Sequence, residues 1–416
     1  MKQCPCRGHA AHCLFPYKRP DILYPLHTGP GIAGLCAFYC RTVINAERGG
    51  DSNGIAILPV RRKRFGHTIY GRKQWDNKAD IWRMSYEKTK RFVSFILIAV
   101  LVLGIITVGV LDSGIDADPS LDHAHPELLR SISTLYSRDY VTSNGTQGGY
   151  ADQYGHGTHV AGIIAAAGNN GEGVCGVGGY DPNEDEVSVP PLNQAIRVAS
   201  FRVLEDGDKG RSSNVAEAID DATELEIPIL NLSLGYLAPS ETSEDEGEKY
   251  EGIALKTAML DYPGLLVCSA GNNGINTDTA GPLNHYPSEY DIPNMIVVGA
   301  CTSALTKVQG TNYGQTTVDI FAPGQDVLSC YPRAQCYFNS CDEATHFEDG
   351  YHYGGLTSIA TPHVTAVAAL VMSKNPDLTP EQIIDRIMDG AIVYASLANY
   401  CASGGILNAY NALYPS

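Results

Sequence analysis

The stretch GLTSIATPHV, from Gly355 to Val364, places one serine directly before an apolar helical pattern that continues to Met372. Ser358 therefore lies at the predicted start of a helix, where unpaired backbone N–H groups and the positive end of the helix dipole favour developing negative charge. A serine hydroxyl is a weak nucleophile by itself, and it needs a base that a third group orients. The residues upstream of this stretch contain candidates for both groups.

Two upstream motifs carry those candidates. The segment VGVLDSGID (108–116) predicts a short buried strand that ends in the carboxylate of Asp112 and a glycine turn. The segment YGHGTHVAG (154–162) predicts a glycine-flanked entry into a helix of small residues, with His156 at its start. Taken singly, Asp112 is explained as a turn former, His156 as a helix cap and Ser358 as an N-cap residue. Their joint order and their flanking residues indicate a catalytic triad instead.

In the order Asp, His, Ser, these three motifs resemble those of the subtilisin-like serine proteases, the subtilase family. Three further segments are similar to family segments: ILNLSLG (229–235), VCSAGNNG (267–274) and TTVDIFAPG (316–324). The resemblance covers roughly residues 105–413. It implies an α/β, subtilisin-like fold in which helices cover both faces of a mostly parallel central sheet.

The resemblance also implies a mechanism, that of a serine endopeptidase. Ser358 would attack the scissile carbonyl, His156 would accept and return the proton, and Asp112 would orient the imidazole. Asn272 would donate a hydrogen bond to the oxyanion beside the Ser358 N–H, and the neighbouring Asn273 is a rival for that role.

Substrate binding is implied in the same way. Ser233, Leu234 and Gly235 match the family strand that pairs with an extended polypeptide substrate, and a glycine there leaves room for the substrate backbone. His285 falls, in the family register, near the floor of the primary specificity pocket, where a histidine is unusual. We therefore expect His285 to be a surface residue.

Two residues near Ser358 depart from the family pattern. Leu356 replaces a usual glycine, and glycine is used where the backbone needs a positive φ or a close approach. Leucine with a positive φ costs of order 1–2 kcal/mol, so it could distort the turn, or Gly355 could absorb the strain. Ile359 replaces the usual methionine, a nearly volume-conserving change. An inactive binding protein with the subtilase fold is therefore the alternative to an active enzyme.

A structural calcium ion is the cofactor that the resemblance implies, and no catalytic cofactor is expected. Glu127, in HPEL (125–128), matches a segment that supplies a carboxylate ligand, and Asn170, in NNGEGV (169–174), matches the loop that supplies the other ligands. Hard oxygen donors of this kind suit calcium. The family carboxylate is usually an aspartate and the family loop is one residue shorter, so both residues depart from the pattern.

The N-terminal residues differ from the rest of the chain in charge. Residues 1–91 carry a net charge of +11, and the remainder carries −28. No nucleic-acid-binding motif accompanies the basic residues, so no nucleic-acid partner is expected and a propeptide-like or disordered segment is the preferred interpretation. The cluster RRKR at 61–64 is explained equally well as a processing site or as a solvated charge cluster.

An uncharged run of 20 residues, 92–111, has the length and apolarity of a membrane anchor. Its last part, 105–111, is needed as the strand that leads to Asp112. The remaining residues, 92–104, would span only about 20 Å as a helix, less than the roughly 30 Å hydrocarbon core. We therefore predict a structural boundary near Gly104.

Two regions follow from that boundary. Residues 1–104 form an N-terminal region that is a pro-region, a membrane anchor through 92–104 or the product of a mis-joined gene model. Residues 105–413 form the peptidase domain. We expect a monomer in the secretory pathway that is either secreted or membrane-anchored.

The peptidase domain alternates apolar strands with helical patterns, as a parallel α/β sheet requires. The predicted strands are 105–111, 199–204, 228–234, 264–269 and 295–300, and the predicted helices are 156–166, 212–225, 249–261, 358–373 and 379–390. Twelve cysteines suit a compartment that permits disulfides, although their pairing does not follow from the sequence. Cys175, Cys268 and Cys301 are candidates for free core thiols.

Overall fold

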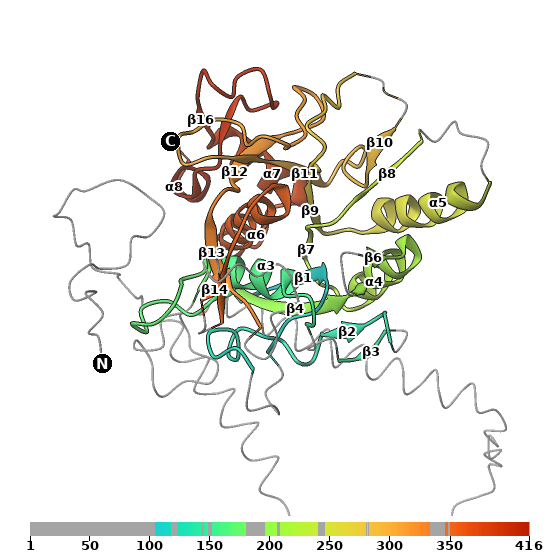
Figure 1. The fold of residues 1–416 in the computed structure, drawn as a ribbon, viewed down its shortest axis with the longest axis vertical. Helices are drawn as coiled ribbons and strands as arrows, with labels where there is room; N and C mark the ends of the chain where they lie inside the picture. Colours follow the sequence, from blue (N-terminus) through green and yellow to red (C-terminus); the bar gives the residue numbers. More distant parts are fainter. Residues whose placement is uncertain are drawn as a thin grey trace, which may run out of the picture. The chain divides into compact units, whose positions relative to one another are not determined.

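A sheet of ten strands organises the part of the chain that the structure describes (Figure 1). The structure is a computed structural model, and it describes residues 105–117, 124–142, 145–148, 152–179, 196–205, 209–239, 246–279, 281, 283–332, 346–347 and 350–415. The strand order across the sheet is β16-β17-β12-β11-β9-β7-β1-β4-β2-β3. Neighbours from β17 to β2 are parallel, and the outermost pair at each end is antiparallel.

The strands differ widely in length. The large sheet contains β1 (Ile106–Asp112), β2 (Arg138–Asp139), β3 (Thr146–Gln147), β4 (Ile196–Arg202), β7 (Ile229–Leu232), β9 (Leu265–Ser269), β11 (Met295–Cys301), β12 (Ile320–Pro323), β16 (Ile392–Val393) and β17 (Gly405–Ile406). Three smaller sheets contain β5 (Leu204–Glu205) with β6 (Lys209–Gly210), β8 (Tyr236–Ala238) with β10 (Asn284–Tyr286), and β13 (Val327–Cys330) with β15 (Tyr351–Gly354) and β14 (His346–Phe347).

β1 lies in the middle of the large sheet, and all of its residues are buried. It pairs with β4 along its whole length and with β7 on its other side. A parallel strand that is covered on both faces needs a nearly continuous apolar run, and residues 106–111 supply one. Gly109 allows a close approach, because a Cβ there would lie 2.5 Å from Leu230 Cδ2. The strand delivers Asp112 to the carboxyl edge of the sheet.

Helices cover both faces of the sheet, as the sequence predicts. They are α3 (His156–Ala165), α4 (Ser212–Glu224), α5 (Glu246–Asp261), α6 (Thr357–Lys374), α7 (Pro380–Asp389) and α8 (Ala409–Leu413). On one face α3 and α6 pack together and share a core with Val108 and Val110 of β1. On the other face α4 and α5 pack together around Leu111 and Leu230.

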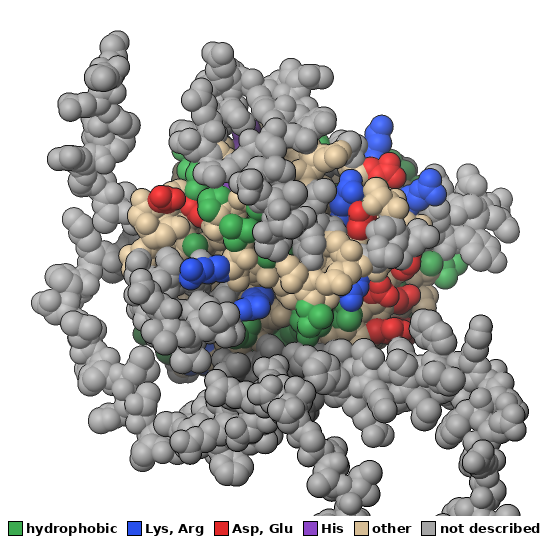
Figure 2. Space-filling model, turned by 90° about the horizontal axis from the view of Figure 1, so that it is seen from below, with side chains coloured by type: hydrophobic (Ala, Val, Ile, Leu, Met, Phe, Trp, Pro, Cys, Tyr) green, Lys and Arg blue, Asp and Glu red, His purple; other side chains and the backbone are tan. Residues whose placement is uncertain are grey.

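The sequence of α4 shows how such a helix is oriented. Four of its five buried residues recur at spacings of three and four, which places them on one side of the helix: Val215, Ala218, Ile219 and Ala222. Its exposed side carries the acidic residues Glu217, Asp220 and Glu224. Figure 2 shows acidic side chains gathered on the side of the molecule where α4 lies in Figure 1. The acidic composition of this part of the chain thus appears as a solvated surface.

The five predicted strands and the five predicted helices are confirmed to within three residues at each end. Cys268 and Cys301 are confirmed as free buried thiols, and Cys330 and Cys401 are buried thiols as well. The prediction of a core thiol at Cys175 is wrong, because this residue is exposed in the loop after α3.

Several predictions fall on residues 1–104, which lie outside the described residues. They concern the basic region, the cluster at 61–64 and the anchor candidate at 92–104. In the described parts of the chain, no helix is both long enough and apolar enough to cross a membrane.

Candidate active site

Asp112 and His156 meet at the carboxyl edge of the sheet. Asp112 is the last residue of β1, and His156 is the first residue of α3. The Nδ1 atom of His156 lies 2.8 Å from Oδ1 and 3.0 Å from Oδ2 of Asp112. The aspartate side chain is 1% exposed and the imidazole 20%. Since Nδ1 faces a carboxylate, it carries a proton, and Nε2 is left as the acceptor of the neutral ring.

The close contact depends on a glycine next to the histidine. A Cβ on Gly157 would overlap with the carbonyl oxygen of Gly114 and would lie 3.1 Å from the Cβ of Asp112. Only glycine allows the two backbones to approach in this way. The glycine after His156 in the motif HGTH is therefore explained by packing against the end of β1.

A second buried carboxylate, Asp152, fixes the loop that carries His156. It is 6% exposed and accepts hydrogen bonds from the N–H groups of Tyr154, Gly155 and Thr158 at 3.1, 2.7 and 2.9 Å. Burial raises the pKa of Asp152, and the hydrogen bonds from Thr158 and Gly155 act against that increase. Reasoning from the sequence missed this residue. The available signal was an aspartate shortly before a helix, since aspartate is a common capping residue.

Ser113 connects Asp152 to the end of β1. Its hydroxyl donates to Oδ1 of Asp152 at 2.9 Å and accepts from the N–H of Gly157 at 3.0 Å. Its backbone N–H donates to Oδ1 of Asp112 at 2.8 Å. The strand that ends at Asp112 and the helix that begins at His156 are therefore joined by a buried polar network as well as by their direct contact.

Ser358 is the second residue of α6, as the motif predicts. Three hydrogen bonds tie the start of this helix to three loops: from the Leu356 N–H to the Gly324 carbonyl, from the Thr357 hydroxyl to Asn272 Oδ1, and from the Ser233 hydroxyl to the Ser358 carbonyl, each at 2.7 Å. These loops follow β12, β9 and β7, whose carboxyl ends share one edge of the sheet. Ser358 is therefore held at the same edge as Asp112, and α6 also packs against α3.

Pro362 explains why the carbonyl of Ser358 can accept a hydrogen bond from Ser233. In a regular helix this carbonyl would accept from the N–H four residues later, and that position is Pro362, which has no N–H. The hydroxyl of Ser233 donates to it at 2.7 Å instead. The proline in SIATP therefore leaves the carbonyl of Ser358 available to the segment that follows β7.

Asn272 lies against the first residue of α6. Its Oδ1 accepts the N–H of Thr357 at 3.1 Å and the Thr357 hydroxyl at 2.7 Å, and the residue is exposed. Because the amide oxygen is held by the helix, the Nδ2 donor is the atom left for a ligand. Asn312 supports the same loop, since its Oδ1 accepts from the N–H groups of Asn273 and Ile275 at 3.0 and 3.2 Å.

Asp278 anchors the far end of this loop. Its carboxylate accepts hydrogen bonds from the backbone N–H groups of Gln315, Thr316 and Thr317 and from the two threonine hydroxyls. Burial alone raises the pKa of Asp278, but these hydrogen bonds together lower it.

Replacing Asp278 by asparagine is expected to reduce stability more at neutral pH than in acid. A pKa that is lowered in the folded state stabilises the protein above the ordinary value, and this contribution is lost as the pH falls through the folded value. The Asp278→Asn variant should lower the thermal midpoint at pH 7 by a few degrees, as the loss of about 1–2 kcal/mol would. Scanning calorimetry at pH 7 and pH 3 tests this, with the exposed Asp377→Asn as the control. A drop of equal size at both pH values would contradict the assignment.

Leu356 adopts the conformation that its replacement of a glycine suggests. Its φ is 71° and its ψ is −170°, a region that is essentially restricted to glycine and costs of order 1–3 kcal/mol for other residues. The strain is not moved to Gly355, whose φ is not positive. The hydrogen bond from Leu356 to Gly324 and the start of α6 are nevertheless kept.

Leu356→Gly is therefore expected to stabilise the protein. Glycine adopts this conformation without strain but loses more entropy on folding, so we expect a net gain of about 1 kcal/mol, or a thermal midpoint about 2–4 °C higher. Leu356→Ala is the matched control, because it keeps the strain and removes the side chain. Calorimetry that ranks alanine at or above glycine would show that Leu356 is not strained.

Ser233, Leu234 and Gly235 leave β7 beside the start of α6. The carbonyl of Leu234 accepts from the hydroxyl of Ser269 at 3.3 Å, and Gly235 is exposed. The segment is thus bonded to Ser358 through the buried Ser233 and becomes exposed at Gly235.

His285 is 6% exposed, so the expectation of a surface histidine is wrong. The imidazole fills the space beside two glycines, since a Cβ on either Gly235 or Gly271 would overlap with it. Its Nδ1 lies 2.9 Å from the hydroxyl of Ser288. Burial lowers the pKa of His285 to about 4, so the ring is neutral at pH 7.

The side-chain oxygens of Glu127 and Asn170 that would bind calcium accept hydrogen bonds within the protein. Glu127 is 1% exposed, and its Oε1 accepts from the hydroxyl of Tyr351 at 2.5 Å and from the Val174 N–H at 3.3 Å. Burial raises the pKa of Glu127. The Oδ1 of Asn170 accepts from the Glu172 N–H at 3.1 Å. Nowhere in the described residues do three or more His, Cys, Asp or Glu side chains form a group that could hold a metal ion.

Comparisons with known proteins point to one family. A model of the subtilase family matches residues 105–410. An alkaline protease of Alkalihalobacillus alcalophilus is 32% identical over 306 residues, which cover 73% of this chain and 63% of that protein. Subtilisin Savinase of Lederbergia lenta is 31% identical over 306 residues, which cover 73% of this chain and 89% of that protein.

Solved structures show the same similarity. A lanthipeptide protease is 25% identical with a TM-score of 0.57, and the match covers 74% of this chain and 86% of that one. A protease from Pseudoalteromonas arctica is 25% identical with a TM-score of 0.55, over 75% of this chain and 90% of that one. The chain spans less than two thirds of the length of the alkaline protease, because the match covers 63% of it.

Proposed function

The chain belongs to the subtilase family, and from this premise we propose that it is a serine endopeptidase whose nucleophile is Ser358. The observation that carries the proposal is the 2.8 Å contact between Nδ1 of His156 and the buried carboxylate of Asp112. A histidine held in this way presents Nε2 as a base, which is what a serine nucleophile requires.

The proposed reaction begins at the start of α6. The Oγ of Ser358 attacks the carbonyl carbon of the scissile peptide bond and gives its proton to Nε2 of His156. Asp112 keeps the imidazole in the required tautomer and stabilises the imidazolium. His156 then returns the proton to the nitrogen of the leaving amine. Water attacks the acyl-enzyme in the same way and releases the second product.

The oxyanion would be stabilised by two donors. They are the Nδ2 of Asn272 and the backbone N–H of Ser358, which belongs to the unpaired first turn of α6. The bond from Thr357 to Oδ1 of Asn272 supports this assignment over Asn273, because it fixes the amide before any substrate binds.

Extended polypeptides are the proposed substrates. They would form main-chain hydrogen bonds with Ser233, Leu234 and Gly235, and the 2.7 Å bond from Ser233 to the Ser358 carbonyl supports a fixed distance between that segment and the nucleophile. Action in the secretory pathway is part of the proposal, and the family relationship supports it.

Labelling with a fluorophosphonate probe tests the proposal. The probe reacts with an activated serine, and peptide mapping by mass spectrometry should place the adduct on Ser358. Hydrolysis of peptide anilides should disappear in proportion to labelling. A protein with the subtilase fold that only binds its partners would show neither labelling nor hydrolysis, and that result would overturn the proposal.

A further inference from the structure

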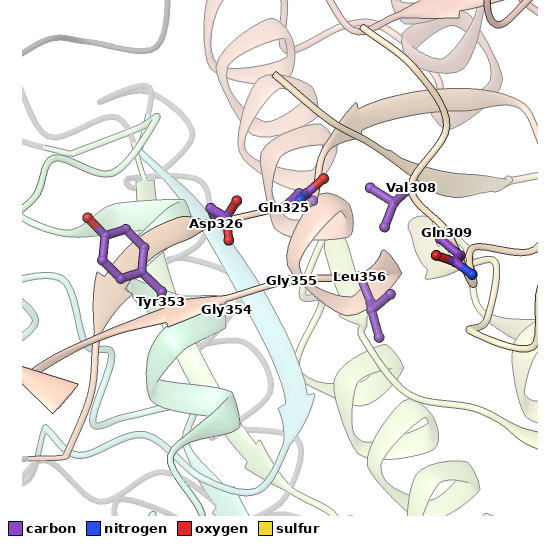
Figure 3. Close-up of a pocket in the computed structure, with 9 residues that line it drawn as sticks. Val308, Gln309, Gln325, Asp326, Tyr353, Gly354, Gly355 and Leu356 are labelled. Atoms are coloured by element: carbon purple, nitrogen blue, oxygen red, sulfur yellow. The ribbon is translucent and has the colours of Figure 1, made fainter. Parts of the chain in front are cut away.

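A pocket of about 450 Å³ lies beside the start of α6, where Leu356 directly precedes the helix (Figure 3). Nine residues line it: Val308, Gln309, Gly324, Gln325, Asp326, Tyr353, Gly354, Gly355 and Leu356. Figure 3 shows Leu356 and Val308 towards one end of the pocket and Tyr353 and Asp326 towards the other. We call this the Leu356 pocket.

The position of the Leu356 pocket follows from the sheet. Ser233 follows β7 and Gly324 follows β12, and β9 and β11 lie between these strands. The start of α6 is bonded to both loops, so Ser358 lies between them. A substrate whose acyl part lies along the loop after β7 therefore extends its leaving-group part towards the loop after β12.

The contacts of α3, the helix that carries the proposed base His156, support the same direction. His156 must reach the leaving amine, and it is carried by α3. The next turn of α3 is tied to the wall of the pocket, because Nε2 of His159 donates to the carbonyls of Val327 in β13 and His352 in β15 at 3.2 and 3.0 Å. Tyr353 and Gly354, at the end of β15, line the pocket.

The pocket has the chemistry for one long cationic side chain. Among the described residues that line the pocket, Asp326 is the only charged one. It is exposed and has no hydrogen-bond or ion-pair partner within the described residues. Lys307, which precedes the lining residue Val308, has other partners: its ammonium lies 3.4 Å from the Thr311 carbonyl and over the ring of Tyr313.

The apolar lining suits the stem of such a side chain. Leu356 is 36% exposed and Tyr353 42%, which is unusual for large apolar residues and leaves surface for the methylene groups of lysine or arginine. The ring of Tyr353 can also attract a cation. Glutamate at the same place would meet like charge.

We propose that the Leu356 pocket binds the side chain of a substrate residue on the leaving-group side of the scissile bond, and that Asp326 selects lysine or arginine there. This inference rests on the proposed endopeptidase function. It assigns a specificity role to Asp326, which takes no part in the reaction steps.

Cleavage of matched peptides tests the inference. Two series of internally quenched peptides vary only the first or only the second residue after the scissile bond, with lysine, methionine or glutamate at that place. In one of the series the protein should cleave the lysine peptide with a kcat/KM about fivefold above that of the methionine peptide, the size of one partly exposed ion pair. The glutamate peptide should be the poorest substrate. The preference should weaken as ionic strength rises.

Substitutions at Asp326 distinguish a lysine preference caused by the pocket from one caused by the overall negative charge of the protein. Asp326→Asn keeps a residue that tolerates the positive φ of 55° at this position, and it should abolish the lysine preference. Asp326→Lys should favour the glutamate peptide. Asp377→Asn, an exposed position outside the pocket, should keep the preference.

The active fraction of each variant is set by fluorophosphonate labelling. Labelled enzyme that shows no lysine preference, or a preference that survives in Asp326→Asn, would overturn the subsite and leave the endopeptidase intact. Absence of both labelling and hydrolysis in the unmodified protein would overturn the function and the subsite together.

Discussion

Ser358→Ala is expected to abolish peptide hydrolysis and fluorophosphonate labelling while leaving the thermal midpoint nearly unchanged. The hydroxyl is the proposed nucleophile, so its removal leaves only the contributions of binding and of the oxyanion donors. For subtilisin itself, a relative of this chain, loss of the serine lowers kcat on the order of a million-fold. Stability should change little, because the hydrogen bonds that hold the start of α6 do not use the Ser358 hydroxyl. They use the Ser358 carbonyl and the side chains of Ser233 and Thr357.

The matched control is Thr361→Ser, in the next turn of α6. Thr361 is buried, and its hydroxyl donates to the Thr357 carbonyl at 2.8 Å, a bond that serine can also form. This variant should stay active. Labelling that persists in Ser358→Ala, mapped to another residue, would discard the proposed nucleophile. A large fall in the thermal midpoint of Ser358→Ala would instead assign its hydroxyl a structural role.

A chain that begins at Ile105 is expected to fold, and a chain that begins at Ser113 is expected not to fold. The difference between them is β1, which pairs with β4 and β7 and is buried throughout. Burial of each large apolar side chain contributes about 1.5–3 kcal/mol, and β1 buries four of them: Ile106, Val108, Val110 and Leu111. Their sum matches much of the 5–15 kcal/mol by which typical domains are stable, before the lost hydrogen bonds of two strand ladders are counted.

Circular dichroism and calorimetry distinguish the two shortened chains. Both carry Ser358→Ala so that self-digestion does not interfere, and both are refolded with and without residues 1–104 added as a separate polypeptide. A cooperative thermal transition in the chain that begins at Ser113 would contradict the central place of β1. Failure of the chain that begins at Ile105 under both conditions would move the predicted boundary upstream of Gly104.

The sequence predicts the fold well where long apolar segments define it. Two examples are the strand that ends at Asp112 and the helix that begins near Ser358. Both combine strong periodicity with recognisable glycine and capping signals, so their positions agree with the structure to within three residues. The pairing of His156 with Asp112 follows from the same signals, because parallel strands and their following helices bring these ends to one edge of the sheet.

Contacts that depend on distant parts of the chain are less predictable. His285 is buried because Gly235 and Gly271, far apart in sequence, leave room for its ring, and no local pattern reports this. Asp152 accepts hydrogen bonds from backbone N–H groups and from Ser113. In the sequence, such an aspartate looks like an ordinary turn residue. The hydrogen bond from the Tyr351 hydroxyl to Glu127 joins residues 224 positions apart, and no local pattern predicts it either.

The three hydrogen bonds that tie the start of α6 to the loops after β12, β9 and β7 affect when activity appears during folding. Ile106 pairs with Ile196, and Phe321 pairs with Ile406, so most of the sheet is built from contacts between residues far apart in the chain. Such a high contact order makes folding slow. Because the turn before Ser358 needs the loops after β7, β9 and β12 at once, we expect the proposed nucleophile to reach its final position among the last features during refolding. A newly made chain would therefore be folded in part but inactive for an interval. In a refolding experiment, probe labelling should lag behind the return of the helical circular dichroism signal.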